Sequence, residues 1–351
     1  MEFLSDYGLF LAKSITIIIT VGIIVAIIAA ASSRGKAGEK GHIEVTNLNE
    51  KYDQMRDSLK DVVVDPEVLK LQHKEDKKKQ KEEKKAAKKA GKDSSDTEHK
   101  SRTYVLNFDG DIKASATESL REEISAVLML ATDKDEVVLR LESGGGMVHS
   151  YGLASSQLAR IKSQGIPLTV CVDKVAASGG YMMACVADKI LAAPFAILGS
   201  IGVVAQLPNF HRLLKKNAID FELLTAGEHK RTLTMFGENT DKDREKFIED
   251  LEDTHDLFKG FVSEHREQVD ISDVANGDVW FGKRALDKKL IDELKTSDEY
   301  LMSKLEASDI YEIEFAHKKS LPEKLGIAAE GAADRLLLSW LSRMQNSRFF
   351  S

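Results

Sequence analysis

Two glycine-rich segments hold the residues of this sequence that could do chemistry, and each follows an apolar run. They read Glu142-Ser-Gly-Gly-Gly-Met147 and Asp173-Lys-Val-Ala-Ala-Ser-Gly-Gly-Tyr181. Glycine permits positive φ and a close approach of backbone to ligand, and N–H groups at a helix start carry partial positive charge. Two such turns side by side could give two donors to one developing oxyanion, with the hydroxyl of Ser178 between them.

Each turn taken alone is also consistent with a tight loop or a phosphate cradle. Neither matches the dinucleotide-binding fingerprint or the P-loop pattern, and Ser178 lacks the G-x-S-x-G elbow of α/β hydrolases. The two cysteines, Cys171 and Cys185, lie in apolar surroundings and predict buried thiols. No Cys and His spacing typical of zinc is present, so we expect neither a metal nor a cofactor.

An alternation of strands and helices must position the two turns. Apolar runs predict strands at Tyr104–Phe108, Glu136–Leu141 and Pro167–Val172, and helical spacing occurs over Ser119–Leu130 and Tyr151–Gln164. This order predicts repeated crossover units with parallel strands, and therefore an α/β fold. The apolar stretch 181–205 has Asp188 and Lys189 in its middle, which favours a buried core segment over a membrane span.

The N-terminal residues predict a membrane anchor over 9–31. The 18 residues from Ser14 to Ala31 carry no charge, which is long enough to span a bilayer as a helix. A cleavable signal peptide is the alternative, because three alanines end the run. The residues before the run are acidic, and the run is long for a signal core, so we expect the anchor to be retained.

The residues 32–100 predict an N-terminal extension and a tether. Lys74–Lys92 is almost entirely Lys, Glu and Ala, so it cannot bury a core. A solvated tether is one interpretation, and contact with anionic lipid headgroups is the other. The formal net charge of −7 argues against nucleic acid as a partner.

Several motifs together resemble the signal peptide peptidase A / SohB family of serine proteases. The signature segments are Ala177-Ser-Gly-Gly-Tyr181, Ala187-Asp-Lys-Ile190, Ala193-Pro194, Gly199-Ser-Ile-Gly-Val203, Gly227-Glu-His-Lys230, Trp280-Phe-Gly282 and Leu290-Ile-Asp292. Arg140-Leu-Glu-Ser-Gly-Gly-Gly146 is similar to the family's oxyanion turn, with Gly144 where a proline is common. The resemblance covers roughly 102–294, and the anchor with its Lys-rich tether makes SohB the closer match.

The resemblance implies a spiral of ββα crossover units, related to the caseinolytic protease and crotonase folds and preceded by the transmembrane helix. It also implies a ring-like homo-oligomer and a serine endopeptidase with a Ser-Lys dyad. By this resemblance Ser178 is the nucleophile, Lys230 is the general base, and Gly145 and Gly179 form the oxyanion hole. Ser200 would orient the lysine by accepting a hydrogen bond from it.

A lysine can take the serine proton only in its neutral form, and burial favours that form. The apolar residues Leu233, Met235 and Phe236 follow Lys230 and are expected to supply the burial. Peptides or unfolded proteins, signal-peptide-like segments among them, are the expected substrates, held in an apolar groove near Met147, Val148 and Met182.

The resemblance places the chain in the bacterial inner membrane as a single-pass protein. We expect the protease domain over 101–318 and an amphipathic helix over 319–351. The best-known relatives act outside the cytoplasmic membrane, which indicates a periplasmic domain. The positive-inside rule indicates the cytoplasm, because Arg34, Lys36 and Lys40 follow the span while only Lys13 precedes it. Both sides stay open.

Three other functions compete with this interpretation. An acyl-CoA enzyme of the crotonase type would use the glycine turns without needing Ser178 or Lys230. A Ser-His-Asp protease would need a histidine base, for which His149, His211 and His229 are candidates. A catalytically silent membrane scaffold would need none of these residues.

Overall fold

The computed structural model describes residues 7–11, 13–17, 19–20, 22, 41–65, 67–68, 100–227 and 229–317. The chain divides into two compact units, and the unit Ile43–Phe315 contains the sheet that bears the glycine turns. In the described ranges no helix combines the length and the apolar character that a membrane span requires. Residues 23–31 of the expected anchor, the Lys-rich run Lys74–Lys92 and the expected helix over 319–351 lie outside the described residues.

The unit is built on one mixed sheet, which in the described residues has ten strands, seven of them in the order β1-β10-β2-β3-β4-β6-β9 and three on a branch. The strands are β1 (His42–Asn47), β2 (Ser101–Gly110), β3 (Glu136–Ser143), β4 (Leu168–Val172), β5 (Val175–Ala177), β6 (Lys189–Ala192), β7 (Ile197–Gly199), β8 (Val279–Phe281), β9 (Glu293–Leu294) and β10 (Ser308–Ala316). The path from β10 to β9 is parallel throughout. A short branch leaves it, in which β5 pairs with β3 and β7 in parallel and β7 pairs with β8 antiparallel.

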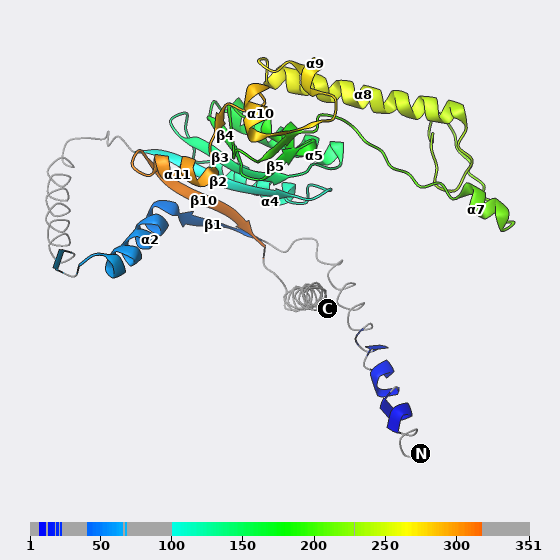
Figure 1. Ribbon diagram of the computed structural model, residues 1–351, viewed down its shortest axis with the longest axis horizontal. Helices are drawn as coiled ribbons and strands as arrows, with labels where there is room; N and C mark the ends of the chain where they lie inside the picture. The colour runs from blue at the N-terminus through cyan, green and yellow to red at the C-terminus, as the bar shows by residue number, and fades with distance from the viewer. Residues whose placement is uncertain are drawn as a thin grey trace, which may run out of the picture. The chain divides into compact units, whose positions relative to one another are not determined.

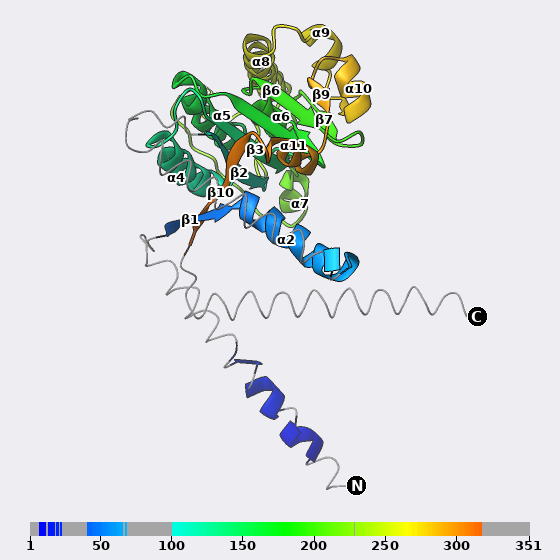
Figure 2. The ribbon, with the colours of Figure 1, turned by 90° about the vertical axis from the view of Figure 1, so that its left-hand side faces the viewer.

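Helices cover both faces of this sheet (Figures 1 and 2). The helices of the unit are α2 (Leu48–Val63), α4 (Thr117–Leu128), α5 (Val148–Ser163), α6 (Gly179–Ala184), α7 (His211–Lys216), α8 (Asp241–His265), α9 (Ile271–Val274), α10 (Gly282–Asp287) and α11 (Ser297–Lys304). The long α8 begins at a capping box, in which the Thr240 side chain and the Asp243 backbone and carboxylate bond reciprocally. It extends well beyond the sheet, and α7 lies near its far end, away from the strands (Figure 1).

The strands that were predicted as apolar runs form the centre of the sheet and are buried on both faces. In β2, Leu106 and Phe108 enter the larger core cluster, while Val105 between them enters the smaller one. A parallel strand covered on both sides needs apolar residues on both sides, which is why these runs do not alternate with polar residues. The larger cluster lies under α4, α5, α6 and part of α8, and the smaller one under α2 and α11.

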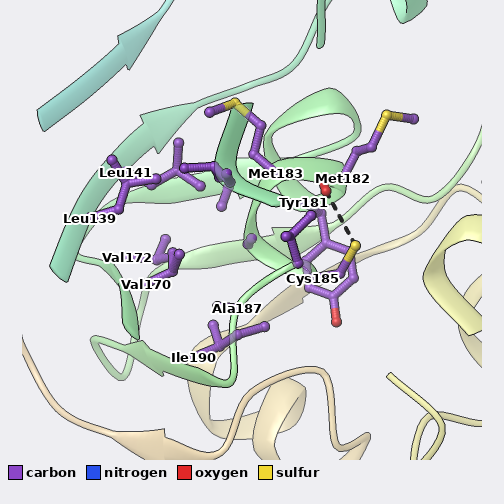
Figure 3. Packing of buried hydrophobic residues seen from close by; sticks show 14 of the residues in the cluster. Leu139, Leu141, Val170, Val172, Tyr181, Met182, Met183, Cys185, Ala187 and Ile190 are labelled. Atoms are coloured by element: carbon purple, nitrogen blue, oxygen red, sulfur yellow. Dashed lines mark hydrogen bonds between the residues drawn. The ribbon is translucent and has the colours of Figure 1, made fainter. Parts of the chain in front are cut away.

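The stretch 181–205 contains the predicted core segment, since residues 181–187 and 190–192 are buried, but Phe195 and Val204 are 84% and 81% exposed. All six residues of α6 are buried, and Figure 3 shows Tyr181 and Met183 in one buried cluster with Val170 and Leu139 of the neighbouring strands. Asp188 is exposed in the turn that follows α6, where its carboxylate accepts the N–H of Leu168 at 2.9 Å. Its charge therefore lies at the surface, beyond the buried residues that follow the helix.

One carboxylate, that of Glu123 on α4, is buried without full compensation. The side chain is 4% exposed, Oε1 accepts the N–H of Phe315 at 2.8 Å, and Oε2 has no hydrogen-bond partner among the described residues. Burial raises the pKa of Glu123 to about 7, because removing a carboxylate from water disfavours its charged form. The folded protein therefore holds this proton more tightly than the unfolded chain does.

Folding stability should consequently fall as pH rises between about 4.5 and 7, because the unfolded chain releases the proton first. We expect Glu123→Gln, which keeps the acceptor for Phe315, to remove this part of the pH dependence. At pH 8 it should raise the free energy of unfolding by about 2–3 kcal/mol. Urea unfolding of the purified wild-type and Glu123→Gln proteins at pH 4.5 and pH 8 checks this. An equal change in the free energy of unfolding at the two pH values would contradict it.

Candidate active site

Ser178 stands at the turn from β5 to α6 in a conformation that side chains rarely adopt. Its φ is 52° and its ψ is −120°. Two backbone hydrogen bonds hold it there: Ser178 donates its N–H to the carbonyl of Gly199 at 2.8 Å and accepts the N–H of Met182 at 2.9 Å. A positive φ at a residue with a Cβ costs free energy that the surrounding structure must offset, and such residues concentrate at functional sites.

The two residues after Ser178 are glycines because the start of α6 touches its neighbours with no space for a side chain. A Cβ on Gly179 would come within 2.4 Å of the Tyr151 ring, and a Cβ on Gly180 would come within 2.5 Å of the Ser143 carbonyl oxygen. The backbone at the start of α6 therefore lies directly against the last residue of β3, Ser143, and against the ring of Tyr151 on α5.

The first glycine turn lies against the second, which is the arrangement that the sequence led us to expect. Gly145 has φ +85°, and a Cβ there would meet the Gly179 nitrogen at 2.6 Å and the Ser178 Cβ at 2.7 Å. Gly145, Gly179 and Ser178 consequently share one small volume. A residue with a Cβ at position 145 could not approach this closely.

The backbone N–H groups around this volume are not equivalent. Gly179 is the first residue of α6, so its N–H has no acceptor within the helix. Gly145 instead donates its N–H to Ser143 Oγ at 3.0 Å. The N–H of Gly146, the next residue, has no hydrogen-bond partner among the residues that the structure describes. Among the described residues the N–H of Gly144 has no partner either. Of Gly145 and Gly146, the turn thus leaves Gly146, which sequence reasoning did not select, with an unpaired N–H, while that of Gly145 is bonded to Ser143.

A pocket of about 770 Å³ opens over Ser178. Four of the five predicted site residues, Ser178, Gly145, Gly179 and Ser200, line it, together with Gly146. Its walls are mostly apolar and include Val148, Met182, Val203, Leu257, Phe258 and Phe261. Met147, which was expected in the groove, is 43% exposed and does not line the pocket.

Helix α8 supplies one wall of the pocket, and sequence reasoning missed it. Thr254, Leu257, Phe258 and Phe261 recur at the three- and four-residue spacing of one helix face. The spacing was visible in the sequence, but it indicates only a buried face and does not say what that face covers. The ring of His255 bonds through Nε2 to the carbonyl of Ile201 at 3.1 Å, which ties α8 to the chain after β7.

Ser200, like Ser178, has a positive φ, in this case 50°. It donates its N–H to the carbonyl of Asp278 at 2.7 Å, so its turn is fixed to the chain before β8. Ser200 and Ser178 line the same pocket. The hydroxyl of Ser200 is therefore placed where it could contact a group that approaches Ser178.

Lys230 is not brought to Ser178 within one chain. It is exposed, does not line the pocket, and lies in the segment between β7 and α8. Met235 and Phe236, expected to bury it, are themselves 38% and 41% exposed. Three aromatic rings organise this segment: Phe210 stacks on Phe236 with 5.9 Å between centroids, and Phe221 lies 5.8 Å from Phe236.

The three histidines considered as alternative bases are not at the pocket either. His149 and His229 are exposed, and neither they nor His211 line it. In the described part of the chain, no cluster of His, Cys, Asp and Glu is arranged to hold a metal ion.

The comparisons with known proteins identify the family of this chain. The family model described as Peptidase family S49 N-terminal matches residues 2–158, and that described as Peptidase family S49 matches residues 160–310. The chain is 49% identical over 338 residues to the "Probable protease SohB" of Haemophilus influenzae, covering 96% of each chain. It is 51% identical over 324 residues to the protein of the same name from Buchnera aphidicola, covering 92% of this chain and 93% of the relative.

A mutant of the 1510-N membrane-bound stomatin-specific protease, solved with a substrate peptide, is a more distant match. Its identity is 14% and its TM-score 0.39, over 64% of this chain and 96% of that one. The full-length relatives decide the class: the chain is a protease. It belongs to peptidase family S49, which confirms the family expected from the motifs.

The strain at Ser178 gives a prediction that does not depend on activity. Ser178→Ala keeps the Cβ and therefore the unfavourable φ, whereas Ser178→Gly relieves it. Strain of about 1–3 kcal/mol, less the entropy that glycine adds to the unfolded chain, should make the glycine variant more stable than the alanine variant by about 1 kcal/mol. Urea unfolding of the two purified variants measures the difference. A less stable glycine variant would show that Ser178 is unstrained.

Proposed function

We propose that this protein is a membrane-anchored serine endopeptidase in which Ser178 is the nucleophile and Lys230 is the general base. The observation that carries the proposal is the strained Ser178 at the start of α6, beside unpaired N–H donors and an apolar pocket. A helix start and glycine turns place N–H groups where negative charge would develop on a carbonyl oxygen under attack.

The reaction follows from these positions. The hydroxyl oxygen of Ser178 attacks the carbonyl carbon of a peptide bond, and its proton passes to the neutral amine of Lys230. The N–H groups of Gly179 and Gly146 receive the oxyanion, while Gly145 holds the turn. The resulting ammonium protonates the leaving amine, and water then releases the acyl group from Ser178 by the same steps.

Lys230 acts from a second copy of the chain in this proposal. Its exposure, and its absence from the pocket of its own chain, support a base supplied between copies. The segment around it exposes large apolar side chains: Leu207, Phe210, Leu213, Phe221, Leu224, Met235 and Phe236. Covering them with a neighbouring copy would remove water from the lysine and favour its neutral form. Ser200, which lines the pocket, would then accept a hydrogen bond from that lysine, and repetition of the contact would close a ring.

The substrates proposed are peptides and unfolded or signal-peptide-like segments with apolar side chains. The apolar residues that line the pocket, Val148, Met182 and Phe258 among them, support this class. We propose that residues 9–31 anchor the protein in the bacterial inner membrane. Protease accessibility in intact cells and spheroplasts decides between a periplasmic and a cytoplasmic domain.

Substitutions of the dyad test the proposed chemistry. Ser178→Ala should lower kcat/KM on a fluorogenic peptide at least about 1,000-fold without loss of folding. Lys230→Arg should be as inactive as Lys230→Ala, because a guanidinium stays protonated and cannot accept the serine proton. Substantial activity of Lys230→Arg that still requires Ser178 would assign the base to another residue.

Mixing two inactive variants tests where the base comes from. If Lys230 serves the pocket of a second copy, co-assembled Ser178→Ala and Lys230→Ala chains should recover measurable activity, since some contacts pair an intact serine with an intact lysine. Ser178→Ala co-assembled with a Ser178→Ala, Lys230→Ala chain is the control and should stay inactive. No recovery, despite mixed oligomers shown by native mass spectrometry, would place the dyad within one chain.

A further inference from the structure

Behind the glycine turn, two buried hydroxyl groups form a hydrogen-bond chain that the proposed reaction does not use. Ser143 ends β3 and is 2% exposed, and Tyr151 on α5 is fully buried. Ser143 Oγ lies 2.5 Å from Tyr151 Oη, which in turn lies 2.7 Å from the carbonyl oxygen of Asp111. Gly145 N–H reaches Ser143 Oγ at 3.0 Å.

The chemistry of these groups fixes the direction of the chain. A carbonyl oxygen only accepts, so Tyr151 must donate its proton to Asp111. Ser143 then donates to Tyr151 at 2.5 Å rather than to its other acceptor, the carbonyl of Gly110 at 3.4 Å, and the Ser143 oxygen is left to accept the N–H of Gly145. Every member is satisfied, and burial strengthens such a network because no water competes for its bonds. Burial also raises the pKa of Tyr151, so it stays protonated and able to donate.

The same tyrosine contacts the second turn through its ring. The site of a Cβ on Gly179 lies 2.4 Å from the Tyr151 ring, so the ring supports the first residue of α6 directly. Both hydroxyls are themselves confined, because a Cβ on Gly110 would come within 2.6 Å of each. Tyr151 therefore touches the backbone of one oxyanion donor and holds the turn of the other through Ser143.

The turn between Gly145 and Met147 is held at both ends. Gly145 N–H is bonded to Ser143, and Met147 N–H donates to the carbonyl of Ile112 at 2.9 Å. The peptide that carries the Gly146 N–H lies between these two fixed peptides. Glycine residues would otherwise let it rotate, and a rotated donor gives less stabilisation to an oxyanion.

We propose that Ser143 and Tyr151 are positioning residues that aim the N–H donors of Gly146 and Gly179 at the developing oxyanion. The inference rests on the proposed function, because it gives these donors the role of an oxyanion hole. Ser143 and Tyr151 do not touch the substrate; they act through the backbone of the two turns.

The test compares Tyr151→Phe and Ser143→Ala with a matched tyrosine. Tyr181→Phe is the control: Tyr181 is equally buried and donates to a backbone carbonyl, that of Leu290 at 2.9 Å, and it does not line the pocket. On an apolar fluorogenic peptide, both test variants should lose about 10- to 100-fold in kcat with KM unchanged within about twofold. Tyr181→Phe should change kcat less than about threefold.

A peptide aldehyde of the same sequence provides a second readout, because its adduct with Ser178 carries an oxygen at the oxyanion site. Its Ki should rise in the test variants by about the factor by which kcat falls, and should not rise in Tyr181→Phe. The double variant Ser143→Ala, Tyr151→Phe should resemble Ser143→Ala alone, since the tyrosine hydroxyl acts through the serine.

The outcomes separate the two proposals. Wild-type protein without Ser178-dependent hydrolysis would refute the proposed function itself. Active wild-type protein, with test variants that match Tyr181→Phe in kcat and aldehyde Ki, would overturn only the positioning role. Losses that multiply in the double variant would also overturn it, because two independent effects cannot come from one hydrogen-bond chain.

Discussion

The contact between the start of α6 and the end of β3 is the constraint on which the site depends. At this contact Gly145 meets Gly179, and a single added Cβ would lie 2.6 Å from a backbone nitrogen. Backbone packed this closely has no side chains to define its geometry, so it must be held by hydrogen bonds and by neighbouring side chains. The bond from Ser178 N–H to the Gly199 carbonyl and the bond from Gly145 N–H to Ser143 supply this support.

The sheet explains why such support is available. Strands β3, β5 and β7 are parallel and adjacent, so the turns that follow them come out at one edge. Ser143, Ser178 and Ser200 are the polar residues at these three strand ends, and the last two carry positive φ. The larger apolar core holds α5 and α6, the helices that follow the turns after β3 and β5. The packing of this core offsets the strain at Ser178.

The position of Lys230 sets it apart from the other residues of the proposed site, because it does not line the pocket that Ser178 lines. The proposed nucleophile and N–H donors come from tightly packed turns, whereas the proposed base, Lys230, lies on an exposed segment with apolar side chains in water. A base that works only when neutral gains from such an arrangement. The dyad would then form where copies of the chain meet, and the isolated chain would hold an incomplete site.

The sequence by itself determined the family, the central strands and helices, and the two turns that bear Ser178 and Gly145. These follow from local patterns: apolar runs for buried parallel strands, and glycines where only backbone fits. The tertiary structure alone decided that α8 walls the pocket, that Gly145 N–H is already bonded, and that Ser143 and Tyr151 stand behind it. Each of these is either a contact between segments distant along the chain or the orientation of one hydroxyl group. Residue type and spacing do not encode such directions, because the same serine could bond to any of several neighbours until the fold places them.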